Sequence, residues 1–134
     1  MKAQCLCGAV SLEVEHNQHV YCCHCERCRT WASGAHFAVE AIVTPKITGN
    51  QYISRYQSSD SLERCFCKQC GTHVFSYIIP SDRYTINAGL FKENQNFHLS
   101  MQYFTDLQAP YYHLSDDSPS MTAAEFLAQS SRKD

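Results

Sequence analysis

Nine cysteines are the residues of this chain most able to do chemistry, and they fall into three clusters. A CxC lies close to the N-terminus, a CxCxxC directly follows the extra cysteine Cys22, and a CxxC-Gly comes after the extra cysteine Cys65. The three clusters are Cys5-Leu6-Cys7, Cys22-Cys23-His24-Cys25-Glu26-Arg27-Cys28 and Cys65-Phe66-Cys67-Lys68-Gln69-Cys70-Gly71. A CxxC turn followed by glycine aims two thiolates at one point, which is half of a tetrahedral zinc site. The pattern therefore predicts metal binding.

Two divisions of these thiols into sites follow from the spacing. In the first, Cys5, Cys7, Cys67 and Cys70 form a closed four-thiolate site, and the central CxCxxC forms a second site with three ligands. Structural zinc takes four protein ligands, whereas catalytic zinc takes three and keeps one position open. The second division joins the central cluster to the CxxC and leaves the CxC unused. Spacing favours the first division and does not exclude the second.

Three further residues of the clusters need an interpretation. Cys22 and Cys65 each precede a candidate ligand in what we expect to be extended chain, where neighbouring side chains point to opposite faces. We interpret both as small buried hydrophobic residues. His24 could be a fourth ligand of the central site, but its place between two ligating cysteines favours a side chain that faces away from them.

Composition limits the class of protein that the chain can be and indicates the cellular compartment in which it works. The 134 residues fit a single domain, 1–134, with 44% hydrophobic and 18% charged residues. The formal charge of −2 argues against a nucleic-acid surface. No apolar run is long enough to span a membrane, and the N-terminus lacks the pattern of a signal peptide, so we expect a cytoplasmic protein. Reducing conditions there disfavour disulfides, which again points to metal ligation.

The elements expected to position the cysteines are mostly β-strands. Alternating apolar and polar residues, rich in tyrosine and phenylalanine, predict strands over 8–15, 36–43, 51–56, 72–79, 84–90 and 97–104. Helix is expected at the end alone, where Thr122 and Glu125 form a capping-box pattern that opens 123–129. The sequence thus predicts a mainly β domain whose loops carry the metals.

In this order, the motifs resemble the glutathione-dependent formaldehyde-activating enzyme family, which includes centromere protein V. The resemblance covers about 3–120 and rests on these segments: Cys5-Leu-Cys7-Gly8-Ala9-Val10, Cys23-His24-Cys25-Glu-Arg-Cys28-Arg29, Gly34-Ala35, Tyr56-Gln-Ser58-Ser59, Arg64-Cys-Phe66-Cys67-Lys-Gln-Cys70-Gly71-Thr72, Asn87-Ala-Gly89-Leu90, and Ala109-Pro110-Tyr111-Tyr112 with Asp116-Asp117. It implies a fold of Mss4-like coiled β-sheets with two zinc ions per chain. It also implies the first division of the thiols, with structural zinc on the outer four cysteines and catalytic zinc on Cys23, Cys25 and Cys28.

The resemblance implies a carbon–sulfur lyase of the S-(hydroxymethyl)glutathione synthase type, which adds the thiol of glutathione to formaldehyde. Zn²⁺ with three thiolates can bind a fourth thiol and deprotonate it, so the cysteines would hold and activate a small-molecule thiol substrate. Glutathione has two carboxylates, for which Arg29 and Arg64, with Arg55 beside them, are candidate contacts. Trp31 is a candidate wall of the pocket.

Two other functions remain as alternatives. A non-catalytic zinc-binding interaction module of the same fold would be favoured by a central zinc with His24 as its fourth ligand. Thiol redox chemistry would require a reactive Cys22 or Cys65.

Overall fold

A computed structural model of the chain describes residues 1–114 and 118–130. Asp116 and Asp117, which belong to the family resemblance, lie outside the described residues. The chain forms two compact units. The first comprises Met1–His19 and Ala38–Phe97, and the second comprises Val20–Phe37 and the chain from His98 onward. The expectation of one domain over 1–134 stays a prediction.

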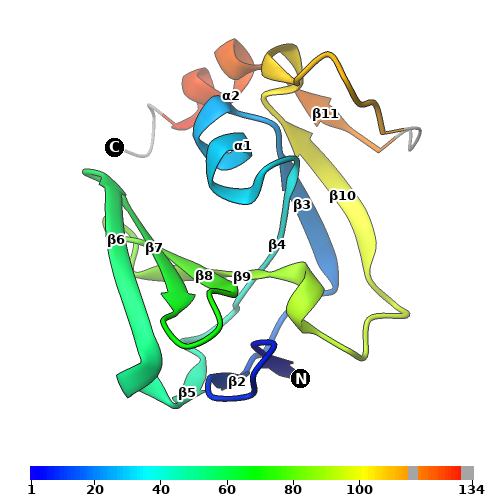
Figure 1. Cartoon of the computed structure of the whole chain (residues 1–134). Coiled ribbons are helices and arrows are strands. Elements are labelled where there is room, and N and C mark those ends of the chain that lie inside the picture. The colour runs from blue at the N-terminus through cyan, green and yellow to red at the C-terminus, as the bar shows by residue number, and fades with distance from the viewer. Residues whose placement is uncertain (115–117, 131–134) are drawn as a thin grey trace. The chain divides into compact units, whose positions relative to one another are not determined.

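A small antiparallel sheet of the first unit carries the N-terminal cysteine turn (Figure 1). Its strands, in the order β1-β2-β5, are β1 (Lys2–Gln4), β2 (Ser11–Glu13) and β5 (Lys46–Thr48). Ala3 pairs with Leu12, and Leu12 pairs with Ile47. Strand β2 lies within the strand expected over 8–15, and it shows the expected alternation, since Leu12 is buried while its neighbour Glu13 is exposed.

A longer antiparallel run of strands makes up the rest of the first unit and appears largely in green in Figure 1. Consecutive strands in the order β4-β9-β8-β7-β6 pair with one another. They are β4 (His36–Glu40), β6 (Ile53–Ser59), β7 (Leu62–Cys67), β8 (His73–Ile78) and β9 (Arg83–Asn87). Two short 3₁₀ helices, η1 (Asn50–Tyr52) and η2 (Ala88–Leu90), occupy ends of the strands expected over 51–56 and 84–90.

The core of this first unit is apolar and carries a cluster of rings. Phe75, Phe91 and Ile86 are almost fully buried. The ring of Phe91 packs edge-on against His16 and Phe97, with centroids 5.3 Å away in both cases. Burial of such side chains is the main source of stability for the strands that carry Cys65 and Cys67.

The second unit carries the central cysteines on a strand and a helix. Its strands follow the order β11-β10-β3. They are β3 (His19–Cys23), β10 (His98–Tyr103) and β11 (Ser120–Met121), and the helices are α1 (Glu26–Ala32), η3 (Thr105–Leu107) and α2 (Ala123–Ser130). Strands β10 and β11 pair in parallel. The expectation of extended chain at Cys22 and Cys65 is confirmed by β3 and β7.

Helix α1 corrects the expectation that helix occurs at the C-terminal end alone. It begins directly after Cys25, whose sulfur accepts a hydrogen bond from the backbone N–H of Cys28, and it ends at Ser33 with φ 64°. A cysteine thus takes the capping role that serine, threonine, aspartate or asparagine usually fills. The seven-residue helix also lacks a periodic apolar stripe, which is why the pattern did not predict it.

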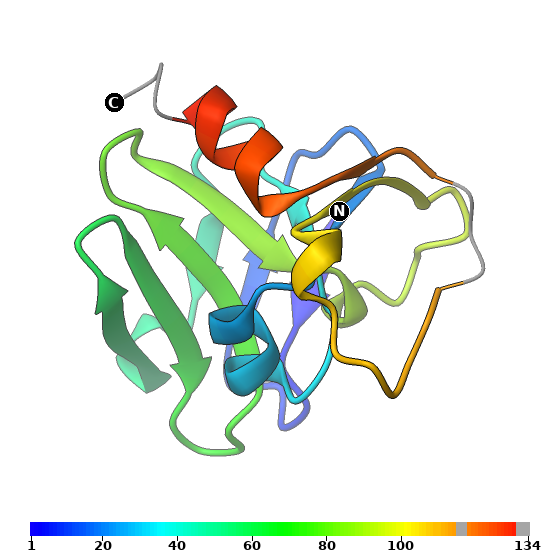
Figure 2. The same ribbon diagram turned by 90° about the horizontal axis from the view of Figure 1, so that it is seen from above.

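Helix α2 starts with the expected capping box. The hydroxyl of Thr122 accepts from the backbone N–H of Glu125 at 3.2 Å, and the carboxylate of Glu125 accepts from the N–H of Thr122 at 2.9 Å. The helix lies beside η3, as Figure 2 shows, and Ala123 N–H donates to the carboxylate of Asp106 at 2.7 Å. The expected fold class, mainly β with a short C-terminal helix, is confirmed. None of the helices within the described residues is long and apolar enough to cross a membrane.

Candidate functional site

The outer four cysteines come together in the first unit, from two segments about 60 residues apart. The sulfur atoms of Cys5, Cys7, Cys67 and Cys70 all lie within 4.8 Å of one another. Both segments form tight turns that end in a glycine with positive φ, 84° at Gly8 and 78° at Gly71. Because a side chain would disfavour that conformation, glycine lets each turn direct its two thiols to one side.

The distances between these sulfurs test whether a metal fits. Cys7 Sγ lies 3.7 Å from Cys5 Sγ and 3.8 Å from Cys67 Sγ. An ideal tetrahedron with Zn–S bonds of about 2.3 Å has edges of about 3.8 Å. The four thiols therefore match the donor type, number and spacing of a closed zinc site.

The surroundings of this cluster favour the thiolate form of Cys70 and Cys5, whereas, against the lowering effect of the Ala9 backbone, burial and the neighbouring thiols raise the pKa of Cys7 to about 11. The hydroxyl and backbone of Thr72 lower the pKa of Cys70 to about 5. Cys5 Sγ accepts a hydrogen bond from the backbone N–H of Val10 at 3.3 Å. Hydrogen bonds of this kind stabilise the charged form that a metal requires. Metal ligation itself stays a prediction.

The central three cysteines come together in the second unit, at the junction of β3 and α1. Cys23 ends the strand, Cys25 caps the helix and Cys28 lies in the first turn, and their sulfur atoms are within 4.8 Å of one another. Cys28 N–H donates to Cys25 Sγ at 3.3 Å. Hydrogen bonds with the thiols of Cys23 and Cys28 lower the pKa of Cys25 to about 2 and raise that of Cys23 in compensation. Three soft donors at this spacing fit a thiophilic metal such as zinc.

His24 is buried and engaged elsewhere. Its ring Nδ1 lies 2.5 Å from the hydroxyl oxygen of Tyr112, and its Nε2 lies 2.8 Å from Oε1 of Gln102. Since both ring nitrogens are used and His24 is absent from the thiol cluster among the described residues, its ring has no nitrogen left for a metal. The central cluster keeps three protein donors.

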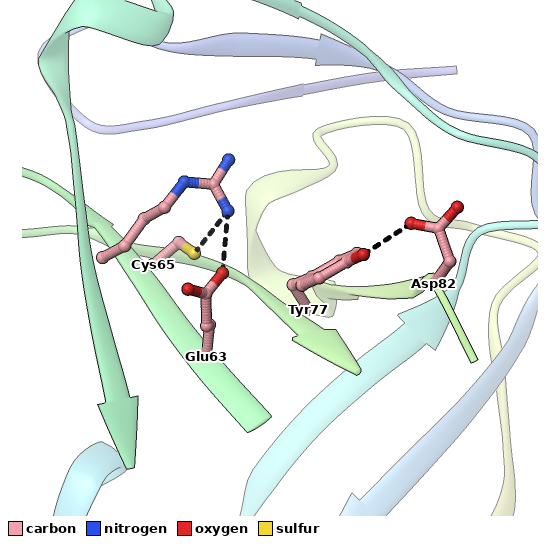
Figure 3. A network of polar contacts seen from close by, with 5 residues as sticks. Glu63, Cys65, Tyr77 and Asp82 are labelled. Atoms are coloured by element: carbon pink, nitrogen blue, oxygen red, sulfur yellow. Dashed lines mark hydrogen bonds and ion pairs between the residues drawn. The ribbon is translucent and has the colours of Figure 1, made fainter. Parts of the chain in front are cut away.

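The two extra cysteines are fully buried, at 0% exposure. Burial raises the pKa of Cys22 to about 12 and that of Cys65 to about 11. The Nη1 of Arg55 donates to the sulfur of Cys65 at 3.6 Å and to Glu63 Oε1 at 3.3 Å. Figure 3 shows Cys65 and Glu63 side by side, with these two contacts as dashed lines. The guanidinium also lies 5.5 Å from the centre of the Phe75 ring, so this arginine has structural partners. Neither cysteine has the exposed, acidic thiol of a redox site.

The two arginines expected to contact glutathione lie in different units. Arg29 follows Cys28 in α1 and is half-buried, and its Nη1 donates to the carbonyl of Leu107 at 3.1 Å. Arg64 belongs to β7 in the first unit, where it is buried and donates from Nε to the hydroxyl of Ser58 at 3.1 Å. Trp31 is half-buried near the end of α1. Contact of any of them with a substrate stays a prediction.

A cavity of about 540 Å³ lies in the same unit as the central cluster. Amide and hydroxyl groups dominate its wall, which includes Gln102, Thr105, Gln108, Tyr112 and Ser118. This is the size range of small-molecule sites. Gln102 and Tyr112 also hold His24, a connection that sequence reasoning missed. Tyr112 had appeared within the family resemblance, but Gln102 gave no signal because its importance comes from a contact 78 residues away.

The fold and the site define a mainly β protein with two cysteine clusters, one of four thiols and one of three, each of which could hold a metal ion. Comparison with known proteins then identifies its family. Residues 1–107 match the model of the glutathione-dependent formaldehyde-activating enzyme family, and the chain belongs to that family.

Two relatives agree with this assignment. An uncharacterized lyase of Schizosaccharomyces pombe is 34% identical over 128 residues, which cover 94% of this chain and 93% of the relative. A crystal structure of a Rhodobacter sphaeroides protein is similar in fold, with a TM-score of 0.60 and 26% identity over 69% of this chain and 89% of the other. Family and relative together support a function of the formaldehyde-activating lyase type in general.

Proposed function

We propose that the protein is a zinc-dependent carbon–sulfur lyase of the S-(hydroxymethyl)glutathione synthase type. The observation that carries the proposal is the central cluster, where three thiols converge within 4.8 Å and the neighbouring histidine is engaged elsewhere. Three protein donors leave a position for an exogenous ligand, as catalytic zinc sites do. Family membership supports glutathione as that ligand and formaldehyde as the second substrate.

In this proposal Cys23, Cys25 and Cys28 hold the catalytic zinc, and Cys5, Cys7, Cys67 and Cys70 hold a structural one. Zinc on the central site would supply a place where a thiol binds as a thiolate and stays nucleophilic. In the overall reaction a carbon–sulfur bond forms between glutathione and the formaldehyde carbon. The carbonyl π electrons move to oxygen, which receives the proton that the thiol gave up.

The chain's own residues would orient the rest of the thiol substrate. The amide and hydroxyl wall of the 540 Å³ cavity suits the two peptide-type amides of glutathione. Arg29 lies close enough to this wall for its charge to lower the pKa of Tyr112, although burial raises that pKa overall. Its guanidinium is therefore our first candidate for a glutathione carboxylate. Arg64 is the second candidate for a glutathione carboxylate, although its side chain is buried and its Nε already donates to the hydroxyl of Ser58.

The alternatives receive less support. A non-catalytic module with His24 as a zinc ligand would need a ring nitrogen that Gln102 and Tyr112 occupy. Redox chemistry at Cys22 or Cys65 would need an accessible thiolate, and both are fully buried with raised pKa values.

The test is adduct formation above the spontaneous background. Zinc-loaded protein is added to glutathione and formaldehyde, and exchange into S-hydroxymethylglutathione is followed by NMR exchange spectroscopy. We expect an excess rate for the wild type and for Cys65→Ala, a control thiol outside both clusters. We expect that rate to disappear in Cys25→Ser. No excess rate from wild type carrying two zinc equivalents would refute the enzymatic proposal.

A further inference from the structure

A hydrogen-bonded network encloses His24, the residue between two of the central cysteines. The side chain is fully buried; Nδ1 lies 2.5 Å from Tyr112 Oη, and Nε2 lies 2.8 Å from Gln102 Oε1 and 3.5 Å from the sulfur of the buried Cys22. Its backbone N–H donates to the carbonyl of Tyr103 at 3.1 Å. Three hydrogen bonds thus attach this one residue to a segment about 80 to 90 residues away in sequence.

The directions of these hydrogen bonds are mutually consistent. The amide nitrogen of Gln102 donates to the hydroxyl of Ser118 at 3.3 Å, so its oxygen faces His24. An amide oxygen can only accept, and therefore Nε2 of His24 carries the hydrogen. In the neutral ring Nδ1 then accepts from the hydroxyl of Tyr112. The chain of donors runs from Tyr112 through His24 and Gln102 to Ser118, and every buried group in it is satisfied.

Extended backbone connects this network to the direction of the thiols. Cys23 ends strand β3, and Cys25 has extended angles of φ −66° and ψ 161°. Side chains alternate along extended chain, so Cys23 and Cys25 point to one face and His24 to the other. A hydrogen bond that holds the His24 side chain on one face of this segment therefore also fixes the direction in which the thiols of Cys23 and Cys25 point from the opposite face.

We propose that His24 is a positioning residue for the three-cysteine site, held by Tyr112 and Gln102. The proposal rests on the zinc assignment of the proposed function. It gives the segment 102–112 a role in the metal site although none of its residues is a ligand. It also couples the site to the 540 Å³ cavity, because Tyr112 and Gln102 form part of the cavity wall. A molecule that moves either side chain would act on the thiols through His24.

The experiment compares Tyr112→Phe with Tyr111→Phe in cadmium-substituted protein. Tyr112→Phe removes one hydroxyl and with it the bond to His24, whereas Tyr111 is exposed and serves as the matched control. ¹¹³Cd NMR reports the four-thiolate and three-thiolate sites as separate signals. Replacing residues that orient ligands typically lowers metal affinity 10- to 100-fold. We expect Tyr112→Phe to shift the signal of the central site and weaken its cadmium affinity about tenfold.

The outer site is the internal control, since its four cysteines lie in the first unit. We expect its signal and affinity to be unchanged in both variants, and Tyr111→Phe to match the wild type throughout. Gln102→Met, which keeps the side-chain length but loses the acceptor, should shift the central signal in the same way and replaces Tyr112→Phe if that variant does not fold.

A folded Tyr112→Phe and a folded Gln102→Met with a wild-type central signal and affinity would overturn the positioning role and leave the proposed function standing. An equal loss at both metal sites would also overturn it, because that is the result of general destabilisation. A wild type that binds no metal at the central cluster would refute the zinc assignment and this role together.

Discussion

Replacing Cys7 by serine should remove the metal of the outer site with little direct effect on packing. Cys7 is exposed, whereas Cys67 is fully buried and Cys5 nearly so. A serine at residue 7 therefore creates no cavity in the core. The substitution exchanges a thiolate for a hydroxyl, a much poorer ligand for zinc, and so isolates the contribution of the metal from the contribution of burial.

The size of the effect follows from the sulfur spacing. Cys7 Sγ lies 3.7 and 3.8 Å from two of its partners, close to the edge of a tetrahedron around zinc. Loss of a direct ligand should exceed the 10- to 100-fold typical of residues that only orient ligands. We expect metal affinity to fall more than about 100-fold, which is about 2.8 kcal/mol at about 1.4 kcal/mol per factor of ten. By mass action the same amount is lost from the stability of the metal-loaded protein.

Metal-free protein should behave differently. Although the backbone of Ala9 lowers it, burial and the neighbouring thiols raise the pKa of Cys7 to about 11, so in the metal-free protein Cys7 is a neutral thiol near neutral pH and its replacement removes no charge from the cluster. We therefore expect Cys7→Ser and wild type to unfold at nearly the same urea concentration in excess chelator, and at clearly different concentrations with saturating zinc.

The assay is urea unfolding with and without chelator, together with zinc stoichiometry by mass spectrometry. The expected stoichiometry is two for the wild type and one for Cys7→Ser. Equal stability of the two proteins in zinc would refute the reasoning, as would a wild-type stoichiometry of two in the variant. A large loss of stability in chelator would show that Cys7 contributes through packing instead.

Three other predictions test separate parts of the chain. Gly49→Ala should lower the free energy of unfolding by about 2 kcal/mol or more in urea, because Gly49 has φ 86° and an added Cβ would meet the carbonyl oxygen of Ala9 at 1.8 Å. Gly89→Ala is the control: it has open space around it and should leave the free energy of unfolding nearly unchanged. Thr122→Ala should cost about 1 kcal/mol through loss of the cap of α2. Hydrogen bonds from the backbone and the hydroxyl of Thr122 lower the pKa of Glu125, so the stabilisation that depends on its carboxylate is present above the ordinary glutamate pKa and is lost as the pH falls through the lowered value. Circular dichroism of Glu125→Gln across acidic pH should lack that step, whereas Thr122→Ala keeps the backbone N–H that donates to Glu125 and should retain part of it. A zinc-binding dye should extract the two metals in two phases, the three-thiolate site first, and a single phase would contradict the assignment of one open and one closed site.

Much of the fold class followed from local patterns. Alternation of apolar and polar residues predicts strands where β2, β4, β8, β9 and β10 occur. Burial follows that alternation in β2, where Leu12 is buried next to the exposed Glu13, whereas β8 buries Val74, Phe75 and Ser76 in succession. The pattern Thr122 to Glu125 predicts the start of α2 because both hydrogen bonds of a capping box are local. Helix α1 escaped prediction because its cap is a cysteine sulfur, and the thiol's role depends on the turn that also gathers the central cluster.

The candidate sites divide in the same way. Residue types and spacing alone indicated that the chain carries thiols in CxC, CxCxxC and CxxC-Gly turns, because the shape of such a turn depends only on the backbone conformation of neighbouring residues. The sequence left open which two turns face each other, since Cys7 and Cys67 are 60 residues apart and their turns belong to different sheets that meet through the packing of the first unit. The partners of His24 were equally hidden, because they come from 78 and 88 residues away. The type and local spacing of the thiol donors follow from adjacent residues in the sequence. The number of donors at each site depends on long-range packing, which brings four thiols together in one unit and three in the other.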